Sequence, residues 1–284
     1  MRNLFGFNLL AMLALVSSPL FADEKSSTKP VEIGIVPYMS VRELITKYEP
    51  LRIYLEHALG TTVKIYTANG FIPFYLNTEK GEYDLAITPS HIARLLQNEH
   101  GYTPLVRFST PGRVLLMSAL NSPLKTVQDL HGLVIAVPDK FALASIACMA
   151  YLSENKLLPG KNFKLLEVPS FPSAIISVQK GDAAAACTAS PPFSFMPKEL
   201  QDSVEILADM GTISGLVILA RPGMKKLTLN KLIQTLLKIN EDPNGGKQFI
   251  TSLGFGPLIP ITSNDMSGLD RYVAETKRLL NEKP

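Results

Sequence analysis

Segments with strand character and segments with helix character alternate along nearly the whole of this chain. Residues 62–66 alternate apolar and polar side chains as a half-buried strand does, and residues 48–59 carry apolar side chains at helical spacing up to Gly60. The same pattern predicts further strands over residues 31–36, 83–87, 105–108, 113–120, 134–137, 164–168, 183–187, 204–207 and 216–220, and helices over residues 71–77, 88–96, 126–130, 141–154, 173–180, 227–240, 246–253 and 269–281. Such strand–helix–strand units favour parallel sheets with helices on both faces, so we predict an α/β fold.

Two long apolar strands divide this pattern. We interpret residues 113–120 and 216–220 as strands that cross between two lobes and act as a hinge. The first lobe would comprise residues 30–112 and 221–284, the second residues 121–212, and each would be a mainly parallel sheet flanked by helices. Ligands of such sheets bind at the carboxyl ends of the strands, where helix N-termini point their free N–H groups. Two facing lobes would therefore form a cleft that closes around a small molecule.

The first 22 residues have the pattern of a cleavable export signal. Arg2 gives a positive start, residues 4–16 are largely apolar, and Ala22 is a small residue before the acidic Asp23. We therefore expect a signal peptide over residues 1–22 and a periplasmic protein that begins near Asp23. The alternative is a retained membrane anchor, against which the short apolar run argues. No cysteine follows the cleavage point, so the sequence predicts no lipid anchor.

Composition excludes several classes of function. The chain has 284 residues, 46% of them hydrophobic and 19% charged, with a formal net charge of +3. A chain so close to neutral gives no electrostatic basis for binding nucleic acid or a membrane surface, and we expect a soluble monomer. The four histidines are scattered, so we expect no metal site. No motif for a nucleophile elbow, a phosphate-binding loop or paired catalytic carboxylates is present, and we expect neither catalysis nor a cofactor.

The chain contains two cysteines, Cys148 and Cys187. An even count in an exported protein is compatible with one disulfide, since the periplasm permits such bonds. Two buried, inert thiols are the alternative, because Cys148 lies on a predicted helix and Cys187 at the end of a predicted strand. Trp is absent, which argues mildly against a sugar ligand stacked on an indole ring.

Several short sequences along the chain together carry a family resemblance. They are Ile-Gly-Ile-Val-Pro at 33–37, Tyr-Glu-Pro-Leu at 48–51, Leu-Gly at 59–60, Gly-Glu-Tyr-Asp-Leu-Ala at 81–86 and Ser-Val-Gln-Lys-Gly-Asp-Ala-Ala-Ala at 177–185. With them the chain resembles the phosphonate- and phosphate-type periplasmic solute-binding proteins of ATP-driven ABC importers. The resemblance covers nearly the whole mature chain. It implies a two-lobed type II periplasmic-binding-protein fold, a small-molecule ligand and an inner-membrane ABC permease as partner.

The second lobe departs from that family where the ligand would bind. Phosphonate receptors of this kind carry a run of Ser and Thr after the strand at 134–137, whereas residues 138–145 here read Pro-Asp-Lys-Phe-Ala-Leu-Ala-Ser. They also carry a His near the position of Phe171, which is here flanked by Ser170 and Pro172. A buried dianion without paired donors costs several kcal/mol. We expect either a phosphonate- or phosphate-like oxyanion or a small organic compound as ligand, and an organic compound with one polar end fits this lobe better than a compact dianion.

The candidate ligand-binding residues follow strand ends or begin helices that would face the cleft. They are Tyr38, Met39, Phe71, Thr88, Ser90, His91, Arg113, Phe141, Ser145, Phe171, Cys187, Thr188 and Ser190. We expect Ser90 and His91 to hold the polar end of the ligand. Thr88 is equally explained as a helix N-cap and Arg113 as a solvated hinge residue. Asp139 and Lys140 are interpreted as a solvated helix entry.

Three functions are compatible with this sequence. The first is a receptor that delivers a ligand to an ABC importer, and the second is a ligand sensor that signals to a membrane kinase. The third is an enzyme on the same fold, such as a relative of a thiamin-precursor synthase with a Cys-rich iron motif and a cofactor-bearing lysine. The absence of clustered cysteines argues against the enzyme. The sequence does not separate transport from sensing.

Overall fold

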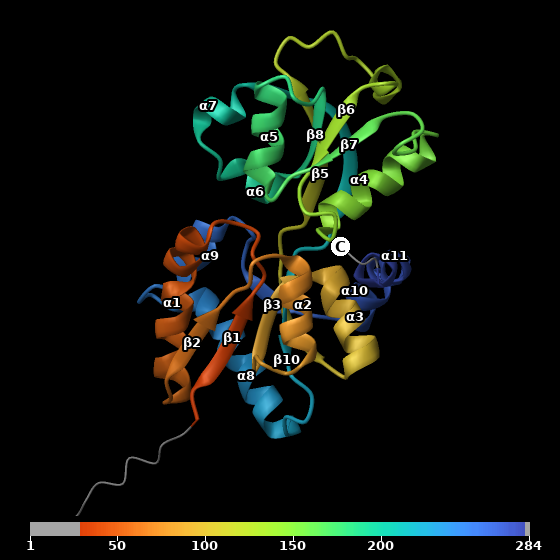
Figure 1. Cartoon of the computed structure of the whole chain (residues 1–284). Coiled ribbons are helices and arrows are strands. Elements are labelled where there is room, and N and C mark those ends of the chain that lie inside the picture. Colours follow the sequence, from red (N-terminus) through yellow and green to blue (C-terminus); the bar gives the residue numbers. More distant parts are fainter. Residues whose placement is uncertain (1–28, 282–284) are drawn as a thin grey trace, which may run out of the picture.

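The computed structural model describes residues 29–281, which form two lobes, one above the other in Figure 1. The first lobe is built on a six-stranded sheet of order β11-β4-β10-β3-β1-β2, and the second on a five-stranded sheet of order β7-β6-β8-β5-β9. The first sheet comprises β1 (Val31–Ile35), β2 (Val63–Tyr66), β3 (Leu85–Pro89), β4 (Thr103–Phe108), β10 (Leu216–Ala220) and β11 (Leu258–Pro260), and the second β5 (Gly112–Ala119), β6 (Val134–Val137), β7 (Lys164–Glu167), β8 (Ala185–Ala189) and β9 (Val204–Ile213). The predicted α/β class is confirmed.

Helices flank both sheets. In the first lobe they are α1 (Val41–Leu59), α2 (Phe71–Glu79), α3 (Ser90–His100), α8 (Lys226–Lys238), η2 (Ile239–Glu241), α9 (Gly246–Leu253), α10 (Ser263–Ser267) and α11 (Asp270–Asn281). In the second they are η1 (Val127–Leu130), α4 (Leu143–Glu154), α5 (Phe171–Gln179), α6 (Ser190–Ser194) and α7 (Lys198–Gln201). No helix among these described residues is long and apolar enough to cross a membrane. The predicted signal peptide lies outside the described residues.

Each sheet has a parallel core extended by antiparallel strands. In the first, β1 pairs in parallel with β2 and β3, and β10 then runs antiparallel between β3 and β4. In the second, β6 pairs in parallel with β7 and β8, and β5 runs antiparallel between β8 and β9. The antiparallel strands β10 and β5 are those by which the chain enters each sheet from the other lobe.

We interpreted the two long strands in the sequence as crossings between the lobes. In the structure, neither strand bridges the lobes. All of β5 pairs within the second sheet, and all of β10 pairs within the first. The chain therefore crosses at residues 109–111 and 214–215, immediately before each strand. A long apolar run looks the same in sequence whether it bridges two sheets or fills the centre of one, and here it does the second.

The helix α1 begins seven residues earlier than its apolar pattern predicts. Ser40 is its N-cap, and a reciprocal capping box joins Ser40 to Glu43. Leu44 in the added turns is buried and lies four residues before the buried Tyr48, so the apolar spacing extends into these turns and the sequence prediction began too late. Pro50 lies inside the helix.

Candidate functional site

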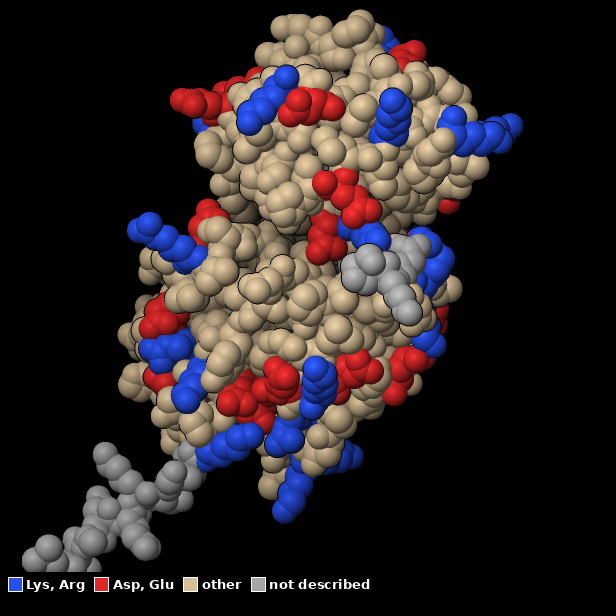
Figure 2. Space-filling model, viewed as in Figure 1, with Lys and Arg blue, Asp and Glu red and all other residues tan. Residues whose placement is uncertain are grey.

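A cavity lies between the two lobes where strand ends and helix starts converge. It contains about 560 Å³ of empty space, including the part open to solvent. Figure 2 shows the surface hollowed between the lobes. Its walls are formed by Tyr38, Phe71, Pro89, Leu216 and Phe255 of the first lobe, by Ala142, Leu143, Ala144, Phe171, Ala189, Pro191 and Pro192 of the second, and by Gly112, Ile213, Ser214 and Gly215 near the crossing segments. Nearly all of these side chains are apolar.

The mouth of the cavity is more polar than its interior. A second hollow continues outward from the first and shares Tyr38, Phe71 and Pro192 with it. The polar residues that line this mouth are Ser40, Glu43, Lys47, Asn69, Asp139 and Ser170. The cleft therefore combines a carbon-lined interior with polar groups nearer solvent, which is the usual arrangement of a small-molecule site.

Tyr38 forms an aromatic wall of the cavity and is fixed from behind. Its hydroxyl lies 3.1 Å from the Tyr48 hydroxyl, and its ring centroid is 5.6 Å from that of Phe255 in an edge-on arrangement. Burial raises the pKa of Tyr38 well above its ordinary value, and the neighbouring Tyr48 raises it further. The phenol therefore remains neutral at physiological pH.

The lobes contact each other beside the cavity through Phe141. This side chain comes from the second lobe and is fully buried. Its ring centroid lies 5.9 Å from that of His91 and 6.2 Å from that of Tyr75, both in the first lobe. The Phe141 carbonyl oxygen is 3.0 Å from His91 Nε2, which donates to it. Phe141 thus packs against His91 and Tyr75 of the first lobe and does not line the cavity.

The buried His91 is neutral. Burial lowers its pKa to about 4, while the hydrogen bond to the Phe141 carbonyl has a smaller raising effect. Because Nε2 donates, Nδ1 is the unprotonated nitrogen, and it has no hydrogen-bond partner among the described residues. His91 therefore donates its one N–H to the Phe141 carbonyl and does not hold the polar end of a ligand in this conformation, contrary to the expectation from the sequence.

Four predicted site residues line the cleft. Tyr38, Phe71 and Phe171 line the cavity, and Met39 lines its mouth. Thr88 and Thr188 are buried one residue before the ends of β3 and β8, and their hydroxyls have no partner in the described part of the chain. The N-cap of α3 is Pro89, so the alternative role of Thr88 as a cap is wrong.

Two serines brace the crossing segments instead of lining the cavity. Ser90 Oγ donates to the carbonyl oxygen of Ser214 at 3.4 Å. Ser190 Oγ accepts from the backbone N–H of Arg113 at 3.0 Å. The Arg113 side chain is 61% exposed and pairs with Asp209, which agrees with its interpretation as a solvated hinge residue.

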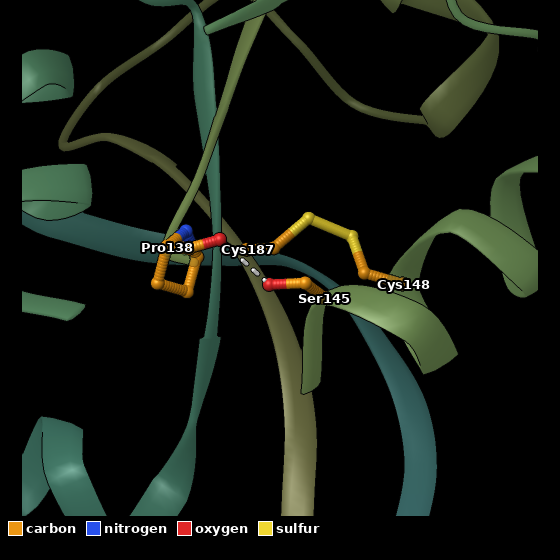
Figure 3. Close-up of a disulfide and its surroundings, with 4 residues drawn as sticks. All are labelled: Pro138, Ser145, Cys148 and Cys187. Atoms are coloured by element: carbon orange, nitrogen blue, oxygen red, sulfur yellow. Dashed lines mark hydrogen bonds between the residues drawn. A yellow bond between two sulfur atoms is a disulfide. The ribbon is translucent and has the colours of Figure 1, made fainter. Parts of the chain in front are cut away.

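Cys148 and Cys187 are joined in a disulfide that ties α4 to β8 (Figure 3). Ser145, one turn before Cys148, donates its hydroxyl to the carbonyl oxygen of Pro138 at 2.9 Å. Both Ser145 and Cys187 are buried, and neither lines the cavity or its mouth. These side chains hold the start of α4 against the second sheet.

The interpretation of Asp139 as part of a solvated helix entry is wrong. Asp139 is half-buried at the mouth, and its Oδ2 accepts the backbone N–H of Phe71 across the cleft at 3.3 Å. A second contact between the lobes lies nearby, where Lys47 Nζ sits 4.3 Å from the centroid of the Phe195 ring. The sequence carried no signal for either contact, because each depends on how the lobes meet.

Sequence reasoning also missed much of the cavity wall. Phe255 follows α9, Leu143 begins α4, and Ile213 ends β9. Apolar side chains at such positions look like ordinary core residues in the sequence. The proline pair Pro191 and Pro192 at the start of α6 was the one recognisable signal, since it marks a helix start directly after a buried strand.

Comparison with known proteins places this chain in a family. Residues 33–266 match the model of the periplasmic substrate-binding proteins of phosphonate ABC transporters. The chain belongs to this family. A comparison with curated proteins gives no match.

Several solved structures are similar to this chain in fold. A binding protein component of an ABC phosphonate transporter from Pseudomonas aeruginosa is 15% identical, covers 89% of both chains and has a TM-score of 0.77. PhnD1 from Prochlorococcus marinus, in complex with methylphosphonate, is 13% identical over 90% of this chain and 99% of that one, with a TM-score of 0.76. The aliphatic sulphonate binding protein SsuA from Escherichia coli is 17% identical over 90% and 95%, with a TM-score of 0.66. These likenesses confirm the type II periplasmic-binding-protein fold.

Membership fixes the general role. The family consists of exported substrate-binding proteins, not enzymes, and its members serve ABC transporters. A small-molecule ligand and an ABC permease are therefore the partners that the family implies.

Proposed function

We propose that this chain captures a small organic ligand, largely apolar with one polar end, between its lobes and delivers it as a periplasmic monomer to an ABC permease. The observation that carries this proposal is the wall of the cavity, which consists mainly of aromatic, aliphatic and proline side chains. Both lobes contribute to the wall, so a ligand there would hold them together.

The energetics favour an apolar ligand body over a compact dianion. Each CH₂ group buried in such a cavity stabilises the complex by about 0.8 kcal/mol. A dianion at the same place would lose its hydration and would meet Ala142, Leu143 and Ala144 at the start of α4 instead of hydroxyl donors. The polar end of the ligand is best accommodated toward the mouth, where Ser40, Asn69 and Ser170 offer hydrogen-bonding groups.

A thermal-shift comparison of matched ligand pairs tests the proposal. Hexanol and hexylphosphonate share an alkyl chain and differ only in the head group, as do butanol and butylphosphonate. We expect the alcohols to stabilise the mature protein, by roughly 2.7 kcal/mol at a hundredfold excess over the dissociation constant. Greater stabilisation by the phosphonate of each pair contradicts the proposal.

Two variants on α4 provide a control for the location of binding. Leu143 lines the cavity, whereas Leu152 is buried in the core of the second lobe on the same helix. We expect Leu143→Ala to weaken the stabilisation by hexanol and Leu152→Ala to leave it unchanged relative to the ligand-free variant. Equal loss in both variants would place the bound ligand outside the cavity.

We propose further that export removes residues 1–22. The supporting observations are the charged start, the apolar run at 4–16 and the small residue Ala22. N-terminal sequencing of the protein from a periplasmic fraction should give a chain that begins near Asp23. Recovery of intact Met1 in the membrane fraction contradicts this.

A further inference from the structure

The helices α2 and α5 occupy corresponding places in the two lobes and are capped differently. Phe71 and Phe171 are their first residues, and each helix is followed by Lys-Gly, at 80–81 and at 180–181. In α5 the N-cap Ser170 accepts the backbone N–H of Ser173 at 3.2 Å. In α2 the N-cap is Gly70, which has no side chain to accept a hydrogen bond. The start of α2 therefore depends on an acceptor from elsewhere.

Asp139 of the second lobe supplies that acceptor. Its Oδ2 accepts the Phe71 N–H at 3.3 Å, while Oδ1 accepts the N–H of Phe141 in its own loop at 2.9 Å. Pro73, at the third position of α2, has no N–H, so a local cap of the kind seen in α5 would lack its donor. A carboxylate at the positive end of a helix is in a favourable electrostatic position.

Phe141 fixes the position of Asp139. Its ring lies against His91 and Tyr75, and its carbonyl accepts from His91 at 3.0 Å. Phe141 is only two residues after Asp139, so these contacts also restrain the position of Asp139. The loop that carries the carboxylate is thus held to the first lobe by a buried ring and two hydrogen bonds.

We propose that Asp139 is a specificity-determining residue that acts as an internal competitor of anionic ligands. Its carboxylate takes the N–H group at the start of α2 and places a negative charge at the mouth of the cleft. An acidic ligand group that approached this helix would meet both the occupied donor and the like charge of Asp139. This inference deepens the proposed function, on which it rests for the place where ligands bind.

Calorimetric titration with methylphosphonate and with inorganic phosphate tests the inference. The proteins are the mature wild type, Asp139→Ala, Asp139→Asn and Asp182→Ala. Asp182 is exposed in the turn between α5 and β8, so its replacement changes the net charge equally, away from the cleft. Thermal melts establish that each variant is folded, and Asp139→Asn retains the side-chain volume should Asp139→Ala fold poorly.

We expect both Asp139 variants to bind methylphosphonate at least tenfold more tightly than the wild type, a change of about 1.4 kcal/mol. Asp182→Ala should bind like the wild type. Equal affinity in all four proteins, no binding in any of them, or an equal gain in Asp182→Ala overturns the inference. Hexanol is titrated into the same four proteins to separate the two proposals. Failure of hexanol to bind contradicts the proposed apolar ligand. The role of Asp139 is then still tested by the ratio of methylphosphonate affinities between the Asp139 variants and the wild type.

Discussion

The two lobes present the same pair of helix starts to the cleft but cap them in opposite ways. In the first lobe, α1 is capped by the Ser40–Glu43 capping box, and the N-cap of α2 is Gly70. In the second, α5 is capped by Ser170, and the N-cap of α4 is Ala142, whose side chain is apolar. Each lobe therefore leaves one helix start without a local cap. Asp139 closes the first of these from across the cleft, and the second faces the carbon-lined cavity.

We propose that this difference changes the ligand class within one fold. The scaffold needs only to bring helix starts together, and a few side chains decide whether their N–H groups face a ligand. Here Asp139 accepts the N–H group at the start of α2. The start of α4 lies beside a cavity lined by Leu143, Phe171 and Phe255. The lobes differ also in how they are held together internally, since the second carries the disulfide between Cys148 and Cys187.

The largest expected effect is that of Phe141→Ala, which breaks the contact between the lobes. Deletion of a fully buried Phe costs about 3–5 kcal/mol. Because Phe141 lies between the lobes, we expect much of this loss to appear as opening, with a larger radius of gyration in small-angle scattering. Phe74, fully buried in the first lobe, is the matched control, and Phe74→Ala should lower stability without opening. Unchanged scattering from a folded Phe141→Ala protein contradicts the role given to this residue.

Removal of the disulfide should weaken the second lobe alone. The bridge closes a sequence separation of 39 residues, for which the loop-closure model gives about 4 kcal/mol. Hydrogen exchange of Cys148→Ala/Cys187→Ala should show lost protection in α4 and β8, with β1 and β3 much less affected. Equal loss of protection in both sheets would mean that the lobes unfold as one unit. It would contradict the claim that the disulfide stabilises the second lobe alone.

Acidification should destabilise the folded protein through His91. Its pKa of about 4 in the folded protein lies below the ordinary value of 6.5, so the unfolded chain binds the proton first as the pH falls. Stability is then fully present above about pH 7 and is lost as the pH falls toward 4, by about 2 kcal/mol between pH 7 and pH 5. Denaturant titrations at both pH values measure this. His91→Gln should show a smaller pH dependence, and an identical slope in the variant contradicts the assignment to His91.

The smallest expected effect concerns the caps themselves. Ser170→Ala removes the cap of α5 and should cost about 1 kcal/mol. Gly70→Ala loses no cap, and its φ of 164° is extended backbone with only ordinary contacts around the new Cβ, so we expect a change within about 0.5 kcal/mol. Equal losses at the two positions would show that α2 and α5 do not differ as described. Chemical denaturation resolves the difference.

The repeating pattern of the sequence predicts the fold well, because alternating strands and helices leave regular traces of burial. The start of α1 was missed, although the Ser40–Glu43 box marks it and the buried Leu44 continues the apolar face of the helix. The site was predicted in part: Tyr38 and Phe171 follow strand ends, as a ligand site in such sheets requires. Phe141 and Asp139 could not be placed, because their partners belong to the other lobe.

The most direct test of the central claim, that the ligand binds in the apolar cavity between the lobes, is a fluorescence titration. The chain has no Trp, so one introduced Trp reports from a single place. Phe255→Trp sets the reporter in the cavity wall, and Tyr66→Trp sets a control at a position 39% exposed in the first lobe. The account predicts that hexanol shifts and saturates the emission of Phe255→Trp, at the concentration seen by calorimetry, and leaves Tyr66→Trp unchanged. A silent Phe255→Trp reporter alongside calorimetric binding would contradict it.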